Sequence, residues 1–352
     1  MPELTIGLTA AHRGESGQSL PIHPQHLASL SAEIRSRLFF ETGYGTPFGL
    51  TDDDLARVSG GVCTRRLIFS ECDVVLLVKP VLEDFMDLTE GQILWGFPHV
   101  EQAGEPPRAT VDRRHAVIAR EPSMDGSGHV PCAPPIGEQL EEMAAYGSVT
   151  HALARAGRTG RWGPPAHAVV LGDGPAGDGA VAALQAQDIT DLTLVTKRFP
   201  AALGARLDGV RTVQLVVDDA GECHAVSPSG HLALHDLLAQ HEIIVNCLGQ
   251  DADVPPTLSP RDQAATLRPG TLVVDASQGQ GAEFGRARPG TSAQPSRHVA
   301  DGVQYYAADD HPSSWWHSAT WMLSRAILPH LGTVASGQAR WLGRGGDTGT
   351  GL

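Results

Sequence analysis

A glycine-rich turn near the middle of the chain carries its clearest chemical signal. The segment Gly172–Gly177 has glycine at its first, third and sixth positions and directly follows the apolar run Ala168–Leu171. Glycines at this spacing between a strand and a helix permit a tight turn, a close approach of the backbone to a pyrophosphate, and close packing of the helix on the strand. The amides that begin such a helix attract anions. The expected dinucleotide-binding residues of this turn are Gly172, Gly174, Pro175, Ala176 and Gly177.

The residues at the end of the following strand decide which dinucleotide fits. In proteins with this turn, the residue that reads the adenosine ribose lies about 20 residues further on. Here that place is held by Thr196, Lys197 and Arg198, after the strand-like run Leu192–Val195. A carboxylate there would repel a 2′-phosphate, whereas a hydroxyl and two cations attract one. We therefore expect NADP(H), with NAD(H) as the alternative cofactor and a non-binding turn with two solvated cations as the structural alternative.

Two polar residues follow strand-like runs in the first half of the chain. Lys79 directly follows Val74–Val78, and His99 follows Gln92–Phe97 after one proline. In a parallel sheet the carboxyl ends of the strands face the ligand. A cation and a group that titrates near neutrality suit the binding of a 2-oxo acid and proton transfer. Lys79 and His99 are thus the candidate catalytic residues, against the alternatives of an exposed lysine and a structural histidine.

Short apolar runs alternate with longer helical stretches, which indicates an α/β protein with parallel strands. The apolar spacing within His26–Phe39 predicts a helix there. In the first half, strands are expected at Leu4–Thr9, Val74–Val78, Gln92–Phe97 and Ala116–Ala119. In the second half, they are expected at His167–Gly172, Leu192–Thr196, Val213–Val217, Ile243–Cys247, Thr271–Asp275 and Gln304–Ala308. Further helices are expected at 136–156, 180–186 and 318–331, and a polar hairpin or loop at Cys223–His231.

The length of the chain and two linker-like segments indicate two domains. A chain of 352 residues exceeds the usual limit for one hydrophobic core. Segments 121–135 and 286–298 are rich in Pro, Gly and Ser and bracket the central region. We expect two Rossmann-like domains, each with a mainly parallel sheet, of which the first is discontinuous. Residues 1–140 and 302–345 would form the substrate domain, 141–301 the dinucleotide-binding domain, and 346–352 a flexible tail.

Composition narrows the classes of partner. The formal net charge of −14 argues against a general nucleic-acid binder, because phosphate binding needs clustered Lys and Arg. No apolar run is long enough for a membrane span, and the first residues lack the pattern of a signal peptide. The five cysteines are irregularly spaced without a C-x-x-C pair, and the scattered histidines lack metal-ligand spacing. These features favour a cytoplasmic protein without a bound metal, acting on small molecules.

Several segments together resemble the alanine dehydrogenase, transhydrogenase and saccharopine dehydrogenase superfamily. Within it, the N5-(carboxyethyl)ornithine synthase branch is the most similar, and its use of NADPH agrees with the basic end of the second nucleotide-domain strand. The resemblance extends over most of residues 4–335 and is sharpest at segments 41–45, 72–80, 91–99, 172–177, 243–247, 270–275 and 310–313.

The resemblance implies roles for individual residues. Lys79 would bind the carboxylate or carbonyl oxygen of a 2-oxo acid such as pyruvate, and His99 would act as general acid and base. The nicotinamide would be lined by Leu248, Gly249, the segment 276–279 with Ser277, and the segment 310–313 with Asp310 and His311, of which His311 could also contact substrate. The implied reaction is a reductive condensation: an amine adds to a 2-oxo acid, water leaves, and a hydride reduces the resulting imine. A homo-oligomer is expected as well.

Two departures from the family pattern keep other functions open. The family places an arginine in the first loop to bind the substrate carboxylate, whereas the matching position here is Ser19, with Arg13 nearby as a substitute. Alanine dehydrogenases carry a second aspartate four residues after the one that matches Asp275, and here that position is Gly279. The alternatives are an alanine dehydrogenase-like amino-acid dehydrogenase and an NADP-binding homologue without catalytic activity.

Overall fold

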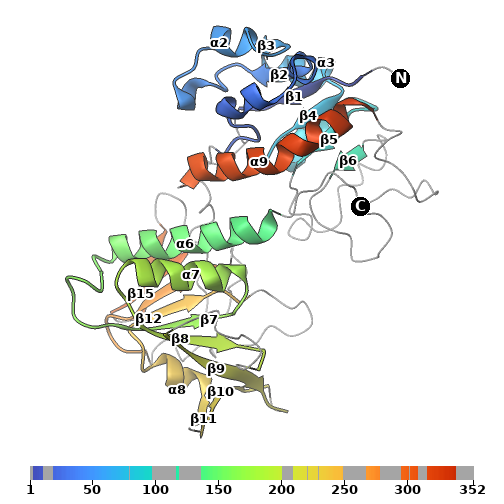
Figure 1. Cartoon of the computed structure of the whole chain (residues 1–352). Coiled ribbons are helices and arrows are strands. Elements are labelled where there is room, and N and C mark those ends of the chain that lie inside the picture. Colours follow the sequence, from blue (N-terminus) through green and yellow to red (C-terminus); the bar gives the residue numbers. More distant parts are fainter. Residues whose placement is uncertain are drawn as a thin grey trace. The chain divides into compact units, whose positions relative to one another are not determined.

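The chain forms two compact units (Figure 1). A computed structural model describes residues 3–10, 19–78, 80–96, 116–118, 136–199, 209–219, 221–228, 230–248, 267–277, 295–300, 302–307 and 315–337. Unit 1 comprises Met1–Ile136 and Trp316–Leu352, and unit 2 comprises Gly137–Trp315. Among the described helices, none has the length and apolar character needed to cross a membrane.

Unit 1 is built on a six-stranded sheet in which every neighbouring pair is parallel. Its strands are β1 (Ile6–Leu8), β2 (Leu38–Glu41), β3 (Gly61–Cys63), β4 (Val74–Leu76), β5 (Ile93–Trp95) and β6 (Ala116–Ile118). The spatial order is β3-β2-β1-β4-β5-β6. The residues of β1, β4 and β5 are fully buried, as continuous apolar strands of a covered parallel sheet should be.

Short helices and one long C-terminal helix complete unit 1. They are η1 (Pro24–Ser29), α1 (Ala32–Arg35), η2 (Thr46–Phe48), α2 (Asp52–Ala56), α3 (Arg65–Glu71), α4 (Leu82–Asp87) and α9 (Trp316–Ala335). Helix α9 returns to the N-terminal strands: Leu20 N–H donates to Thr320 Oγ1 at 2.8 Å, and Leu4 N–H donates to the Ala335 carbonyl at 2.7 Å. The unit is therefore discontinuous in sequence, as expected.

The expected helix over His26–Phe39 is wrong. The segment instead contains η1, α1 and the start of β2. In β2, buried and partly buried residues alternate, and the strand pairs with β1 on one side and β3 on the other. Pairing with distant strands has overridden the local helical spacing of the apolar residues. Strand β3 was not anticipated either.

Unit 2 is built on a nine-stranded sheet of order β11-β10-β9-β8-β7-β12-β13-β15-β14. Its strands are β7 (His167–Leu171), β8 (Asp191–Thr196), β9 (Val210–Val217), β10 (Cys223–Ser227), β11 (Gly230–Ala233), β12 (Ile243–Asn246), β13 (Leu272–Asp275), β14 (Ser296–Ala300) and β15 (Val303–Ala307). The six strands from β9 to β15 in this order are parallel. The antiparallel β10–β11 hairpin extends one edge, as the sequence predicted, and β14 extends the other.

The parallel strands of both sheets follow the same order. The first strand is central, the second and third lie on one side of it, and the fourth, fifth and sixth lie on the other. This is the strand order of the Rossmann fold, in which the ligand binds beyond the carboxyl ends of the strands where the order reverses. The expected fold class, two Rossmann-like domains with mainly parallel sheets, is confirmed.

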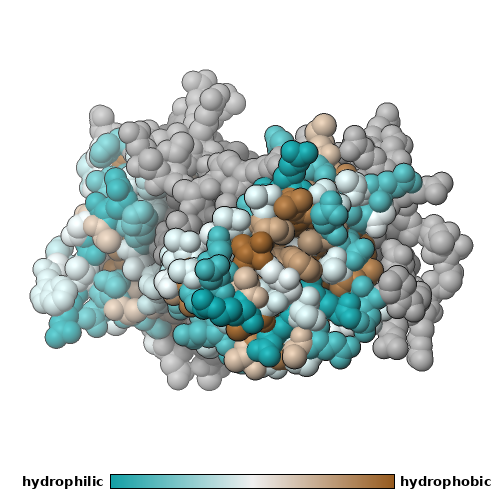
Figure 2. Space-filling model, turned by 90° about the horizontal axis from the view of Figure 1, so that it is seen from above, coloured by the Kyte–Doolittle hydropathy of each residue, from teal (hydrophilic) through white to brown (hydrophobic). Residues whose placement is uncertain are grey.

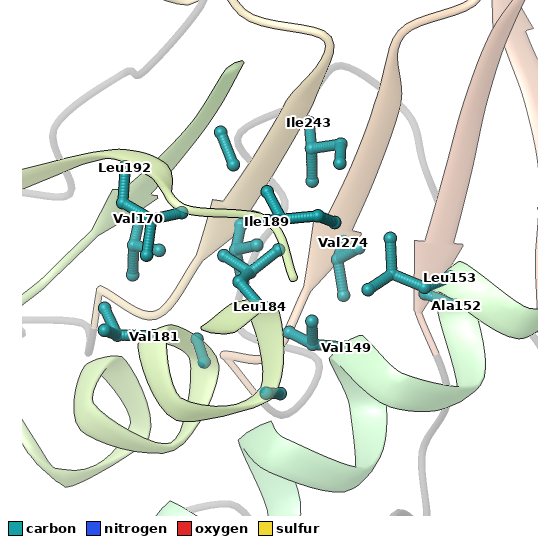
Figure 3. Close-up of a cluster of buried hydrophobic side chains, with 14 of the residues drawn as sticks. Val149, Ala152, Leu153, Val170, Val181, Leu184, Ile189, Leu192, Ile243 and Val274 are labelled. Atoms are coloured by element: carbon teal, nitrogen blue, oxygen red, sulfur yellow. The ribbon is translucent and has the colours of Figure 1, made fainter. Parts of the chain in front are cut away.

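Helices α6 (Gly137–Arg155) and α7 (Pro175–Ala186) cover one face of the sheet of unit 2, where their apolar side chains form a buried cluster with the strands (Figure 3). Val149, Val181 and Leu184 meet Val170 and Val274 there. The helices can approach closely because Gly179 has no side chain: a Cβ at this position would overlap the carbonyl oxygen of Glu142. Helix α8 (Leu234–Leu238) contributes to a second cluster, which contains the alternate residues of the same strands.

The boundary between the units differs from the expected one. A boundary at residue 302 would assign β15 to the substrate domain, whereas β15 pairs with β13 in register from Leu272–Gln304 to Asp275–Ala307. In the structure, unit 2 instead begins after Ile136 and ends at Trp315. The segment expected as a linker over 286–298 also contains the start of β14.

The surface in Figure 2 carries small groups of hydrophobic residues among hydrophilic ones. The large apolar side chains with the highest exposure among the described residues are Trp162, Phe199 and Met86. Isolated apolar side chains are normal on protein surfaces and do not by themselves indicate a partner.

Candidate functional site

The glycine turn of unit 2 has the backbone geometry that its sequence predicts. Gly172 follows β7 with a φ of 103°, a left-handed conformation that favours glycine. Its N–H donates to the Val195 carbonyl at 2.9 Å, and a Cβ added to it would lie 2.8 Å from the Cys247 carbonyl oxygen. A Cβ on Gly177 would overlap the Gly172 carbonyl oxygen. Both glycines are thus required for the chain to turn from β7 into α7.

Gly174 is different, because a Cβ at this position would meet no atom of the described residues within 4 Å. Gly174 is the N-cap of α7, and Pro175 is its first residue. The amides of the first turn of a helix have no partner within the helix, and the positive end of the helix dipole lies at the same place. Gly174, Pro175 and Ala176 are partly exposed. The open space beside these amides fits the pyrophosphate of a dinucleotide.

The end of β8 lies beside this turn. Thr196 is fully buried, and its Oγ1 accepts a hydrogen bond from the Arg198 N–H at 2.9 Å. Arg198 Nε donates to Asp173 Oδ2 at 2.5 Å, and Arg198 Nη2 donates to the Asp173 carbonyl at 3.1 Å. Sequence reasoning did not foresee this ion pair, although Asp173 lies inside the glycine motif. The structure therefore brings the predicted Arg198 against the turn, with Thr196 beneath it and Lys197 exposed.

On the other side of β7, two further predicted residues lie at the ends of neighbouring strands. Leu248 follows β12, and its N–H donates to Asn246 Oδ1 at 3.2 Å. Ser277 follows β13, and its Oγ donates to Asp275 Oδ1 at 2.6 Å. The strand ladder continues past both strand ends, since the Ala276 N–H donates to the Asn246 carbonyl at 2.8 Å. Leu248 and Ser277 thus occupy one edge of the sheet together with the glycine turn.

Six predicted site residues lie outside the described residues: Arg13, Lys79, His99, Gly249, Asp310 and His311. The described neighbours of Lys79 and His99 are nevertheless informative. The Leu77 N–H donates to the Trp95 carbonyl at 3.0 Å, so β4 and β5 remain paired beyond their assigned ends. A Cβ on Gly96 would lie 2.6 Å from the Leu77 carbonyl oxygen and 3.3 Å from Pro80 Cδ. The two segments that lead to Lys79 and His99 are therefore adjacent.

A charged cluster at the same end of the sheet of unit 1 escaped the sequence analysis. Arg65 Nη2 lies 2.7 Å from Asp84 Oδ1, and Arg65 Nη1 lies 3.2 Å from Glu41 Oε2. The Asp84 side chain is fully buried. Glu41 Oε2 also accepts the N–H of Ala10, the second residue after β1, and Asp84 Oδ2 accepts the N–H of Val81, at the start of α4.

This charged cluster joins the end of β2 to the segments that follow β1, β3 and β4 at the carboxyl edge of the sheet. Glu41 belongs to the segment 41–45 that carried the family resemblance, and this was the one available signal in the sequence. In the described part of the chain, no group of three or more His, Cys, Asp or Glu side chains is placed to hold a metal ion.

Comparison with known proteins agrees with this architecture. Residues 153–343 match the profile of the family described as "Alanine dehydrogenase/PNT, C-terminal domain". The chain is 26% identical over 311 residues to alanine dehydrogenase of Mycobacterium tuberculosis, with 85% of this chain and 80% of that protein covered. It is 23% identical over 332 residues to N(5)-(carboxyethyl)ornithine synthase of Clostridium botulinum, with 90% and 93% covered.

A solved structure of L-alanine dehydrogenase is similar in fold. Its TM-score against this chain is 0.69 at 18% sequence identity, and the similarity covers 94% of this chain and 89% of that one. At this identity the likeness establishes the architecture and leaves the chemistry to be argued from individual residues.

Proposed function

Because the chain belongs to the alanine dehydrogenase/PNT family, we propose that it is an NADPH-dependent oxidoreductase that condenses a 2-oxo acid reductively with the amine of an amino acid. The observation that carries the proposal is the contact between the end of β8 and the glycine turn in unit 2. There Arg198 bonds to Asp173 beside the space that the described residues leave open at Gly174. This arrangement supports a bound dinucleotide with a phosphate on its adenosine ribose.

The preference for NADPH rests on the charges beside the turn. Arg198 and Lys197 carry positive charge, and the Asp173 carboxylate offsets part of it. The described contacts of Arg198 with Asp173 use two of its five N–H donors, so further donors remain for a phosphate. Guanidinium groups bind phosphate with good geometry, and the Thr196 hydroxyl holds the backbone of Arg198 in place.

The proton chemistry is assigned to unit 1. Bound NADPH would supply the hydride that reduces the C=N bond. The Lys79 ammonium would bind the carboxylate or carbonyl oxygen of the 2-oxo acid, and His99 would give a proton to the oxygen that leaves as water. The adjacency of the described segments around Leu77 and Gly96 supports a shared role for the two residues. Arg13 and His311 are proposed as further substrate-binding residues.

Substitutions within the family pattern favour this reaction over plain alanine dehydrogenation. Ser19, which stands where the family has its carboxylate-binding arginine, is 8% exposed and carries no charge. Gly279 stands where alanine dehydrogenases have an aspartate. The similarity to the Clostridium botulinum synthase extends over nearly the whole length of both chains. The second candidate function is an alanine dehydrogenase-like reaction with ammonia as the amine.

A screen of NADPH oxidation tests the proposal. Purified protein is given each of a set of 2-oxo acids together with either amino acids or ammonia, and absorbance at 340 nm is followed, the ordinary readout for reduced nicotinamide. We expect oxidation that needs both a 2-oxo acid and an amino acid and that falls roughly 10²–10⁴-fold in His99→Ala. Turnover with a 2-oxo acid and ammonia, but not with a 2-oxo acid and an amino acid, would support the second candidate. A protein that binds NADPH but oxidises it with no pair would be a catalytically inactive homologue.

A further inference from the structure

A buried polar network spans the carboxyl ends of β12, β13 and β15. We infer that Asp275, held by Tyr305 and Asn246, is the positioning residue for the nicotinamide half of the site. It would act through the two segments that follow β12 and β13, without itself touching the substrate. The inference rests on the proposed dinucleotide site in unit 2 and extends it to residues that the sequence analysis did not assign.

Asp275 accepts hydrogen bonds from three directions. Tyr305 Oη donates to its Oδ2 at 2.5 Å, from the neighbouring strand β15. Ser277 donates to its Oδ1 twice, through Oγ at 2.6 Å and through its backbone N–H at 3.1 Å. Asn246 Nδ2 approaches the same oxygen at 3.4 Å from the strand on the other side.

The network is buried and connects Asp275 to the residues that follow β12 and β13. Asp275 is 4% exposed, Tyr305 is 2% exposed and Asn246 is fully buried. A carboxylate in such a place is tolerated only where donors replace the lost water, and hydrogen bonds to a charged acceptor are the strong ones. Here the donors include the side chain and the backbone of Ser277. Asn246, which also donates to Asp275, accepts a hydrogen bond from the Leu248 N–H and so restrains Leu248 as well. One carboxylate therefore fixes both segments that leave the strands.

The position of these segments indicates what they contact. In a Rossmann domain the first βα turn holds the pyrophosphate, and the second strand reads the adenosine ribose. In this unit those elements are the Gly172–Gly177 turn and the end of β8. The nicotinamide half then falls on the other side of the reversal in strand order, where β12, β13 and β15 lie. Leu248 and Ser277 are the residues of that side whose conformation Asp275 fixes.

Two adjacent tyrosines provide a matched pair of variants. Tyr305 and Tyr306 are both buried in β15 but belong to the clusters on opposite faces of the sheet. Each hydroxyl has a described partner: Tyr305 bonds to Asp275, and Tyr306 bonds to His151 Nδ1 on α6 at 2.6 Å. Tyr305→Phe and Tyr306→Phe remove the same atom from equally buried rings of one strand. Among the described contacts, the first removal affects the Asp275 network and the second affects the contact with α6.

The test measures the binding of a whole dinucleotide and of its adenosine half. NADPH fluorescence gives the dissociation constant of the dinucleotide, and calorimetry gives that of 2′,5′-ADP, which lacks the nicotinamide. We expect Tyr305→Phe to weaken NADPH binding by about 10-fold, the size of one hydrogen bond to a charged group, while 2′,5′-ADP binds as in the wild type. Tyr306→Phe should leave both constants within about 2-fold, although both variants lower the melting temperature to a similar degree. Asp275→Asn should behave like Tyr305→Phe with a larger loss.

The outcomes separate the inference from the proposed function. If Tyr305→Phe weakens NADPH and 2′,5′-ADP equally, or if it matches Tyr306→Phe in both constants, Asp275 has a purely structural role and the inference is overturned. If the wild-type protein binds neither NADPH nor NADH, the proposed dinucleotide site fails and the inference fails with it. If NADH binds in place of NADPH, the same comparison is made with NADH and ADP, and the inference stands or falls on its own.

Discussion

The Arg198 guanidinium donates to the Asp173 carboxylate at 2.5 Å and thereby joins the end of β8 to the middle of the glycine turn. The Arg198 side chain is 56% exposed, whereas that of Asp173 is 13% exposed. The cation thus remains accessible while its counter-ion fixes its place beside Gly174. A phosphate on the adenosine ribose would meet a guanidinium that is already oriented, and this is the physical basis for the proposed preference for NADPH.

Removal of the two cations after Thr196 should abolish this preference. In the double variant Lys197→Ala, Arg198→Ala, we expect NADPH binding to weaken by roughly 10- to 100-fold, because two charge-assisted contacts to the phosphate are lost, while NADH binding stays nearly constant. The ratio of the two dissociation constants, measured by nucleotide fluorescence, is the readout. Arg211→Ala is the matched control, since this exposed arginine pairs with Asp191 at the opposite end of β8. A double variant that still discriminates like the wild type contradicts the role of the pair.

Two alanine substitutions in the glycine turn should have opposite signatures. Gly177→Ala places a methyl group against the Gly172 carbonyl, so we expect a lower melting temperature together with lost cofactor binding. The new Cβ of Gly174→Ala would meet no atom of the described residues within 4 Å, and Gly174 has an ordinary φ of −81°, so the melting temperature of this variant should stay near the wild-type value. The new methyl group would occupy the space proposed for the pyrophosphate, and NADPH binding should weaken by more than about 10-fold. Thermal melts with and without NADPH distinguish the two. Normal NADPH binding by Gly174→Ala would place the pyrophosphate elsewhere.

Loss of Arg65 should destabilise unit 1. Arg65→Met removes the cation that pairs with the fully buried Asp84 and with Glu41. Removing one partner of a buried ion pair costs about 3–5 kcal/mol of the free energy of unfolding, because a buried carboxylate loses its compensation. Arg57→Ala, at an exposed pair with Asp54, is the control and should leave the free energy of unfolding close to the wild-type value. Urea unfolding checks both values. Equal stabilities of the two variants would show that the Arg65 cluster contributes no more than a surface pair.

Acidification should weaken unit 1 through His23. Burial, with a smaller contribution from His317 and His26, lowers the pKa of the His23 imidazole from 6.5 to about 4. His23 is 2% exposed and packs against Phe48 and Trp321. Since the unfolded chain takes up the proton more readily, the stability due to neutral His23 is complete above about pH 6.5 and is lost progressively down to about pH 4. The total loss is on the order of 3 kcal/mol.

Tryptophan fluorescence during urea unfolding follows this effect, because the Trp321 ring lies 5.0 Å from that of His23. His23→Gln should flatten the dependence of stability on pH between about pH 6.5 and 4, within the range set by the two pKa values. His231→Gln, at an exposed position of β11, should leave it unchanged. A wild-type protein whose stability is constant across this range would contradict the assignment.

The parts of the fold that sequence predicted are those determined locally. The sequence predicts the turn Gly172–Gly177 because strand, turn and helix are contiguous, and the structure shows that Gly172 and Gly177 have no room for a Cβ. The predicted helix over His26–Phe39 includes the first two residues of β2, because a short apolar run fits the helical and the strand period alike. Pairing with β1 and β3 determines that these residues form a strand. The place of β15 likewise depends on pairing with β13, about 30 residues earlier, across a segment that sequence treats as a linker.

The polar contacts of the site were less accessible to sequence reasoning. Asp173 and Arg198 are 25 residues apart, and Asp275 and Tyr305 are 30 apart. The amino-acid types of these two pairs do not indicate that their members are in contact, because contacts across a sheet depend on strand order and register. Thr196 could be assigned from the Rossmann pattern and Ser277 from the family resemblance, whereas the partners that orient them required coordinates.

The most direct measurement follows the atom that the reaction transfers. The protein is incubated with NADPH that carries two deuterium atoms on C4 of the nicotinamide, a 2-oxo acid, an amino acid and ammonia, and the products are analysed by mass spectrometry. The account predicts a secondary amine that combines the two substrates with loss of one oxygen and carries one deuterium at the former carbonyl carbon. If deuterium appears only in an amino acid formed from ammonia, or in no product from any pair of substrates, the proposed reductive condensation is contradicted.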